Sequence, residues 1–258
     1  MAIHHIVKWT AVCLSLIAPA IAQDMQANEL NHYSGIMNGN IGIGLTLVHG
    51  PDKQLHGSYF YERYRKDIEL KGTYTSDRDI ELNEYDKSGS VRATMHLHFA
   101  ETDPEFKGRE LKEEVLVGSW TSGTKSYPVH LRLESITYVS DESRRYESLG
   151  VEDAQAYERE VQIFYFAVMK GNKNVAARRV RYPVHVNIGK KKIVLRSPTE
   201  FVAHWAEIFT PEYLACLKKA TPHELFVNNR GAAIGRGEVW FDEKGFVVSL
   251  NSCFAPIS

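Results

Sequence analysis

The N-terminal half of the chain alternates short apolar-rich runs with polar or glycine-bearing breaks. Seven runs have the composition of strands: 41–50, 57–64, 67–75, 79–86, 90–99, 115–122 and 127–134. Breaks such as Thr75-Ser76-Asp77 and Lys87-Ser88-Gly89 are typical turn sequences. Strands at this spacing, with no helical pattern between them, indicate an antiparallel meander that closes into a barrel or a sandwich. We therefore predict an antiparallel β domain over residues 31–134.

The pattern changes in the second half of the chain. Residues 152–171 open with a polar helical stretch and then read as a strand. Residues 178–197 read as two strands that turn at Gly189-Lys190. This mixture of helix and strand predicts an α+β domain over residues 140–258.

A helical pair follows these strands. Its first helix has apolar residues at helical spacing, namely Phe201, Val202, Trp205 and Ile208. Ser197 or Thr199 can cap its N-terminus, and Pro211 begins the second helix. We expect the pair to pack on a curved antiparallel sheet.

The last segment, from residue 223 onward, predicts three strands with breaks at Asn228–Gly231 and Asp242–Gly245. Gly231, Gly235 and Gly237 lie in this strand-rich segment and not at the start of a helix, where a phosphate-binding loop needs its glycines. They therefore indicate a bulge or tight curvature of the sheet.

The first 22 residues have the pattern of a secretory signal peptide. Lys8 precedes an apolar run, and Ala20-Ile21-Ala22 places small residues where a signal peptidase cleaves. We expect cleavage after Ala22, a mature chain from Gln23 and export to the periplasm. No later run is long and apolar enough to predict a spanning helix.

Charge argues against nucleic acid as a partner. The chain of 258 residues carries a formal net charge of −1, with 43% hydrophobic and 24% charged residues. Residues 31–134 hold 13 Lys or Arg against 16 acids, and residues 135–258 hold 17 against 14. Neither half is basic enough to follow a phosphate backbone.

Removal of the predicted signal peptide leaves two cysteines, Cys216 and Cys253. Two thiols in an oxidising compartment usually pair, so we predict a disulfide between them. The alternative is two thiols that are buried separately.

The chain has no recognisable catalytic motif, and we expect no enzymatic activity, no cofactor and no metal. His96 and His98 are the best metal candidates because strand alternation places both on one face. A third ligand would have to come from another strand, with His56 and His130 as candidates. A solvated or partner-facing histidine pair is the simpler interpretation.

One strand segment, Gly57–Lys66, carries the best candidate binding residues. Alternation predicts Tyr59, Tyr61, Arg63 and Arg65 on one face. Tyr and Arg dominate binding hot spots because they combine a large rigid area with a polar tip. The alternative is an outer barrel face on which these side chains pack across strands.

Two blocks of sequence resemble known exported bacterial proteins. Residues 57–86 resemble β-rich domains, some of which accompany lysozyme-inhibitor-like modules. Residues 181–241 resemble a periplasmic α+β domain that is cone-shaped like the nuclear-transport-factor-2 superfamily. Similar two-domain proteins are immunity proteins against antibacterial effectors, including phospholipases delivered by type VI secretion.

This resemblance implies a periplasmic, non-enzymatic protein that binds and neutralises a bacterial hydrolase, such as a lipase or a cell-wall enzyme. The alternative is a small-ligand-binding protein or an enzyme that uses the cavity of the C-terminal domain. His204 and Glu238 are the polar residues that would serve such a cavity.

Overall fold

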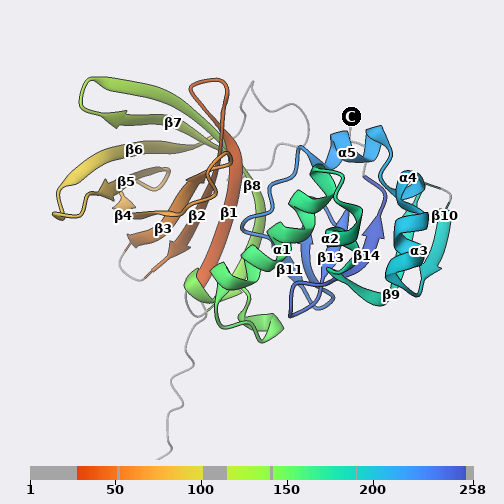
Figure 1. Ribbon diagram of the computed structural model, residues 1–258. Coiled ribbons are helices and arrows are strands. Elements are labelled where there is room, and N and C mark those ends of the chain that lie inside the picture. The colour runs from red at the N-terminus through yellow and green to blue at the C-terminus, as the bar shows by residue number, and fades with distance from the viewer. Residues whose placement is uncertain (1–27, 51–52, 101–114, 140–141, 190, 254–258) are drawn as a thin grey trace, which may run out of the picture.

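The computed structural model describes residues 28–50, 53–100, 115–139, 142–189 and 191–253, and it contains two separate β-sheets (Figure 1). The first sheet is a closed barrel and the second is a six-stranded sheet with helices packed against it. The fold is therefore α+β and mostly antiparallel β. The predicted cleavage site after Ala22 lies outside the described residues.

The barrel is an eight-stranded meander in which every neighbouring pair is antiparallel. Its strands are β1 (Asn28–Met37), β2 (Ile41–His49), β3 (Gln54–Tyr61), β4 (Ile68–Tyr74), β5 (Asp79–Tyr85), β6 (Val91–Ala100), β7 (Val115–Ser122) and β8 (Lys125–Val139). Pairing of β1 with β8 closes it, which decides between the barrel and the sandwich in favour of the barrel.

Strand β1 was not among the seven runs that the sequence predicts. Its pairing with β8 shifts register between His32 and Tyr33, so its inward residues do not follow a simple two-residue period. Tyr33 and Met37 nevertheless point into the barrel core, each 1% exposed.

Strand β2 shows the alternation that fills the barrel. Ile43, Leu45 and Leu47 belong to the barrel core and are fully buried. Gly44 lies between them, and a Cβ at this position would lie 2.3 Å from the ring of Phe60. The missing side chain makes room for the ring of Phe60 on the outer face of β2, where His223 of the second half packs.

The second half of the chain begins with two 3-10 helices, Glu142–Arg144 and Glu147–Leu149. The elements after them are α1 (Ala154–Met169), α2 (Lys173–Ala177), β9 (Val180–Ile188), β10 (Lys191–Leu195), α3 (Pro198–Ala203), α4 (Trp205–Ile208), α5 (Pro211–Leu217), β11 (Phe226–Asn228), β12 (Gly231–Ile234), β13 (Val239–Phe241) and β14 (Val247–Asn251). The sheet order is β10-β9-β14-β13-β12-β11, and only the β9–β14 pair is parallel.

Helix α1 corrects the prediction of a strand near residue 165. Tyr157, Val161, Phe164 and Val168 are buried at helical spacing and belong to the core of this half. The helix therefore continues through the aromatic run, because a 3.6-residue period places these side chains on one face. Asp153 caps its N-terminus by accepting a hydrogen bond from the backbone N–H of Ala156.

The predicted helical pair is present as three short helices, because the first one divides at His204 into α3 and α4. The predicted two strands that turn at Gly189 are β9 and β10. The last segment forms four strands and not three. The additional turn lies between β12 and β13, where Gly235 and Gly237 have φ values of +66° and +102° that favour glycine.

The predicted cysteine pair joins the helical layer to the sheet. Cys216 lies on α5 and Cys253 follows β14, and their sulfurs are 2.01 Å apart. Among the described residues, no helix is both long and apolar enough to cross a membrane.

Candidate functional site

The outer wall of the barrel packs against the second half of the chain, and we call the contact region the junction. The ring of Phe60, on β3, meets the ring of His223 edge-on at a centroid distance of 4.4 Å. Ser58 donates a hydrogen bond to Glu142. Aromatic and polar contacts therefore both cross between the two halves.

A network of buried charges lies in the middle of the junction. His223 Nε2 is 2.6 Å from Asp67 Oδ1, which comes from the barrel, and its Nδ1 is 2.5 Å from Glu158 Oε2 on α1. Arg145 donates two hydrogen bonds to Glu158 Oε1, of 3.0 and 2.8 Å, and the Tyr146 hydroxyl donates a third of 2.6 Å. The Glu158 carboxylate is thus held by groups from three different segments.

The contacts of this network determine the protonation states of Glu158 and His223. Burial alone would raise the pKa of Glu158, but the hydrogen bond from His223 and the charge of Arg145 outweigh it and bring the pKa to about 2. Burial would lower the pKa of His223, but its hydrogen bonds to Asp67 and Glu158 raise it to about 9. In the protein as described, Glu158 is ionised and His223 is an imidazolium at neutral pH.

Glu224 is the most unusual residue of the junction. Its backbone is left-handed, with φ at +48°, and its carboxylate is only 3% exposed. Oε2 lies 2.7 Å from Nδ1 of His32 on β1, whereas Oε1 has no hydrogen-bond partner among the described residues. Non-glycine residues held in this conformation cluster at functional sites because the surrounding structure must impose the strain.

A cleft of about 790 Å³ opens beside these residues. It is bounded by β1, β2 and β3 on the barrel side and by the segment from α5 to β13 on the other. The side chains that give it chemical character are His32, Phe60, His223, Glu224, Arg236 and Glu238. Cations and carboxylates face the same space, as in a site that orients a polar ligand.

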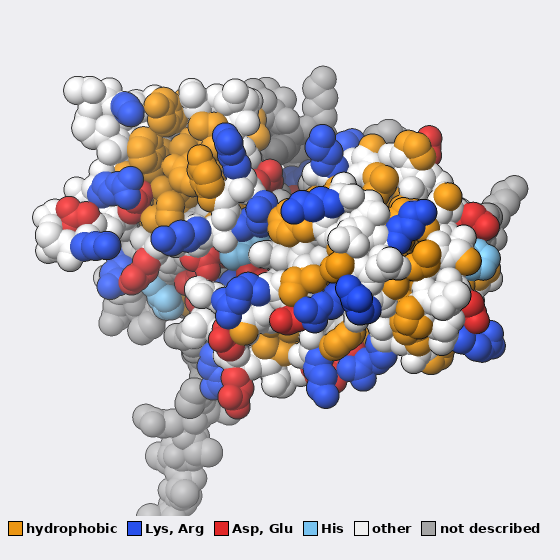
Figure 2. All heavy atoms as spheres, viewed as in Figure 1, with side chains coloured by type: hydrophobic (Ala, Val, Ile, Leu, Met, Phe, Trp, Pro, Cys, Tyr) orange, Lys and Arg blue, Asp and Glu red, His pale blue; other side chains and the backbone are white. Residues whose placement is uncertain are grey.

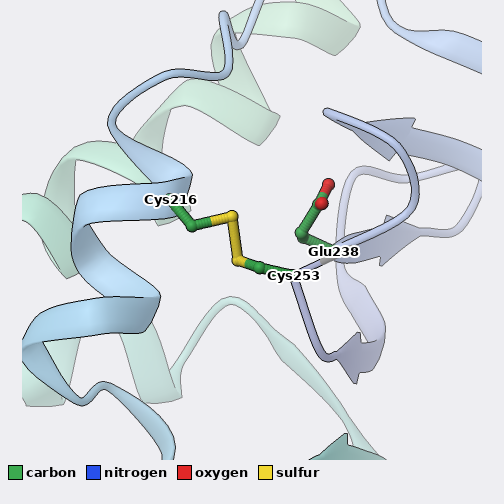
Figure 3. Close-up of side chains that lie close together, drawn as sticks. All are labelled: Cys216, Glu238 and Cys253. Carbon is green, nitrogen blue, oxygen red and sulfur yellow. A yellow bond between two sulfur atoms is a disulfide. The ribbon is translucent and has the colours of Figure 1, made fainter. Parts of the chain in front are cut away.

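The disulfide forms part of the cleft wall (Figure 3). Figure 3 shows the Glu238 side chain beside Cys216 and Cys253, which approach from a helix and from the end of a strand. Glu238 is 5% exposed, and its Oε2 accepts a 2.6 Å hydrogen bond from the backbone N–H of Arg236. His204, the other predicted polar residue, lies elsewhere, with Nδ1 3.5 Å from Glu207.

The four predicted binding residues do not share one exposed face. Tyr59 is 1% exposed inside the barrel, where its hydroxyl donates a 2.9 Å hydrogen bond to Glu84, and Tyr61 is half-buried against its ring. Strand β3 ends at Tyr61, so the alternation does not continue to Arg63 and Arg65. A single exposed Tyr and Arg face is therefore wrong, and the binding role of these residues stays a prediction.

Arg63 and Arg65 lie in the turn between β3 and β4. The Arg65 guanidinium stacks on Phe166 of α1 at 4.8 Å from the ring centroid. Arg63 lies 5.7 Å from the ring centroid of Tyr64, whose side chain is 67% exposed. Tyr64 is thus the exposed aromatic residue of this turn, although it is not one of the four predicted binding residues.

Four turns lie at the same end of the barrel because neighbouring strands alternate in direction: those of β1–β2, β3–β4, β5–β6 and β7–β8. We call the exposed residues there the hairpin-end surface. Its basic, aromatic and apolar members are Arg63, Tyr64, Lys66, Tyr85, Lys87, Val91, Arg92 and Lys125, and it also contains the acids Glu62 and Asp86. Figure 2 shows hydrophobic side chains gathered on the barrel with Lys and Arg around them.

His96 and His98 lie on the exposed outer face of β6, as alternation predicts. Across the strand pair, His98 Nδ1 is 2.8 Å from Asp79 and His96 Nδ1 is 3.6 Å from Glu81. Among the described residues, the two groups of potential metal ligands lie elsewhere: Cys216, Glu238 and Cys253, and Asp67, His223 and Glu224. The two cysteines of the first group form the disulfide.

The junction residues were not found from the sequence. Asp67 and His223 are 156 positions apart, and no local spacing connects them. One residue could have pointed to the junction from the sequence. Glu158 is an acid that follows Tyr157 on α1, and both side chains are buried. No family model, no curated protein and no solved structure matches the chain.

Proposed function

We propose that this chain is an exported, non-enzymatic binding protein that holds a protein partner on the hairpin-end surface. The observation that carries the proposal is the combination of exposed aromatic and apolar groups with basic residues at that end. Tyr64, Tyr85 and Val91 are 67%, 42% and 54% exposed. Arg63, Lys66, Lys87, Arg92 and Lys125 lie among them.

Such a surface suits a partner with an acidic rim around an apolar centre. Tyrosine provides rigid contact area, and the lysines and arginines provide charge complementarity and faster association. Arg63 lies 5.7 Å from the ring centroid of Tyr64, so the two side chains can contact one partner together.

The resemblance to immunity proteins supplies the class of partner. It supports a bacterial hydrolase effector, such as a lipase or a cell-wall enzyme, whose active site this protein covers. The Cys216–Cys253 pair is compatible with an oxidising compartment, and together with the signal-peptide pattern it supports a periplasmic location. We also propose that the C-terminal half is a cone-shaped domain like those of the nuclear-transport-factor-2 superfamily, as the resemblance of residues 181–241 implies.

The proposal is tested with the immobilised protein as bait for exported or injected hydrolases. We expect one hydrolase to bind at one-to-one stoichiometry and to lose its activity in the complex. The double variant Arg63→Ala/Tyr64→Ala should bind at least about tenfold more weakly, since hot-spot residues each contribute about 2 kcal/mol or more. Circular dichroism should show that the variant is folded.

Tyr138→Ala is the matched control. Tyr138 is 66% exposed, like Tyr64, but lies near the end of β8 and therefore at the opposite end of the barrel. Its loss should leave binding unchanged. Equal affinity of the double variant and the wild type would refute this interface, and turnover of a lipid or glycan by this protein alone would refute the class of function.

A second candidate function is the binding of a small ligand in the cleft. Two buried carboxylates, Glu224 and Glu238, face a space of about 790 Å³ that also contains Arg236. A screen of small polar metabolites by thermal shift tests this candidate. A true ligand should raise the melting temperature of the wild type and have less effect on Glu238→Gln.

A further inference from the structure

Three potential metal ligands meet at the junction. One donor atom from each of Asp67, His223 and Glu224 lies within 4.8 Å of the other two. His32 supports Glu224, since its Nδ1 is 2.7 Å from Glu224 Oε2, but it does not belong to this group of three. Of these four residues, two belong to the barrel and two to the second half, so the arrangement exists only in the folded chain.

The surroundings of His223 are those of a metal-binding histidine. Its Nδ1 faces Glu158 at 2.5 Å, which holds a proton on that nitrogen and directs Nε2 toward Asp67. Glu158 is itself fixed by Arg145 and Tyr146. A ligating histidine that donates its other N–H to a held carboxylate is a recurring feature of metal sites.

The charges of the junction leave room for a cation. Asp67, Glu158 and Glu224 face the guanidinium of Arg145 and the imidazolium of His223, so loss of the His223 proton to an incoming ion leaves two negative charges. Glu224 is more than nine-tenths buried, and its Oε1 has no hydrogen-bond partner among the described residues. A buried carboxylate oxygen without a partner is costly, and an ion is one of the groups that can satisfy it.

We propose that Asp67, His223 and Glu224 bind one Zn²⁺ ion, with Glu224 held by His32, and so pin the barrel to the second half of the chain. One imidazole and two carboxylates are nitrogen and oxygen ligands that zinc takes, and a water molecule completes the tetrahedron. The ion replaces the proton between His223 Nε2 and Asp67 Oδ1, and that proton is released to solvent. These two atoms, now 2.6 Å apart, must separate to about 3.3 Å for tetrahedral ligation.

The cleft gives the ion a path to this site, because His32, His223 and Glu224 all line it. The proposal departs from the sequence-based expectation of no metal, which considered only the histidines of β6. It is also independent of the proposed partner binding, since the hairpin-end surface does not include these four residues.

The test uses the full chain, stripped of metal with a chelator and titrated with Zn²⁺ alone. Calorimetry and elemental analysis after dialysis should both give one Zn²⁺ per chain, and the melting temperature should rise with zinc. His32→Ala and Glu224→Gln should each weaken binding by at least about tenfold, because the first removes a group that supports a ligand and the second alters a ligand. Co²⁺ should give the visible absorption of a tetrahedral site, which both variants should alter.

His96→Ala/His98→Ala is the matched control, because this pair also faces two carboxylates but lies on the surface. It should bind zinc as the wild type does. The absence of zinc binding would overturn the proposal. Binding that survives in both His32→Ala and Glu224→Gln, or that is lost in the control, would overturn it equally.

Discussion

The carboxyl group of Glu142 offers a direct test of the electrostatics of the junction, because its pKa depends on the buried groups around it. Its side chain accepts a hydrogen bond from Ser58 of the barrel. Burial raises its pKa to about 7; the carboxylates of Glu224 and Asp67 add to the effect, while Ser58 and Arg145 oppose it. Its ordinary value of 4.5 applies in the unfolded chain.

We predict a pH-dependent effect of Glu142→Gln. Because the folded pKa is raised, the stability that the neutral carboxyl contributes is present below pH 4.5 and is lost as the pH rises through about 7. The full difference in pKa corresponds to about 3 kcal/mol at most. The variant should therefore gain stability relative to the wild type between pH 5 and pH 8, as measured by urea denaturation.

Glu152→Gln is the control for this experiment, since Glu152 is exposed. Its stability difference from the wild type should not change with pH over the same range. A pH-independent difference for Glu142→Gln as well would mean that Glu142 is not held in the buried environment described here.

For single residues of β3, the sequence correctly predicted that side chains alternate between the two faces of the strand. It did not predict that Tyr59 lies inside the barrel. Tyr59 and Phe60 are both large and aromatic, so the pattern along β3 does not reveal which of them points inward. Which of the two points into the barrel depends on the second half of the chain, because His223 of that half packs on Phe60. Such a contact has no signature within the strand itself.

At the scale of single elements, the start of α3 settles an open question of the sequence. Ser197 is the N-cap, and its Oγ accepts a 3.2 Å hydrogen bond from the backbone N–H of Glu200. Thr199, the other candidate, lies within the first turn and is exposed.

We predict that Ser197→Ala lowers the free energy of unfolding by about 1 kcal/mol, the usual effect of losing a cap. Thr199→Ala should change it by less than about 0.5 kcal/mol. Denaturation of both variants under one set of conditions measures the difference. Equal losses would show that the hydroxyl of Ser197 does not act as a cap.

A helix or strand could be predicted where the spacing of apolar residues and the turn residues at its ends indicated the same element. The hairpin of β9 and β10 turns at Gly189, whose φ is +60°. Helix α1 was partly misread because its aromatic residues Phe164, Tyr165 and Phe166 have high strand propensity. Packing on one face of the sheet overrides this local preference, and packing is not visible in a short window of sequence.

At the scale of the whole molecule, the fold class followed from the sequence but the junction did not. Each sheet is specified by local patterns, whereas the junction depends on how one half lies against the other. Asp67 and Arg145 come from different halves, and their 3.6 Å contact exists only after both have formed.

We predict that the double variant Cys216→Ser/Cys253→Ser unfolds more easily than the wild type. The bond closes a loop with a sequence separation of 37, which in the chain-entropy model corresponds to about 4 kcal/mol. Denaturation with and without a reductant measures the effect. The reductant should destabilise the wild type and leave the double variant unchanged, and equal stability of the two proteins would contradict the prediction.

The position of β14 sets an order for folding during synthesis. This strand lies between β9 and β13, so it joins two parts of the sheet that are otherwise separate. A nascent chain that has reached Val139 already contains every strand of the barrel. The second sheet, in contrast, must wait with an open edge on β9 until residues 247–251 have emerged, and an open edge can pair with other chains. A ribosome that stalls before residue 247 would therefore leave a chain whose barrel can fold and whose second half is prone to aggregate.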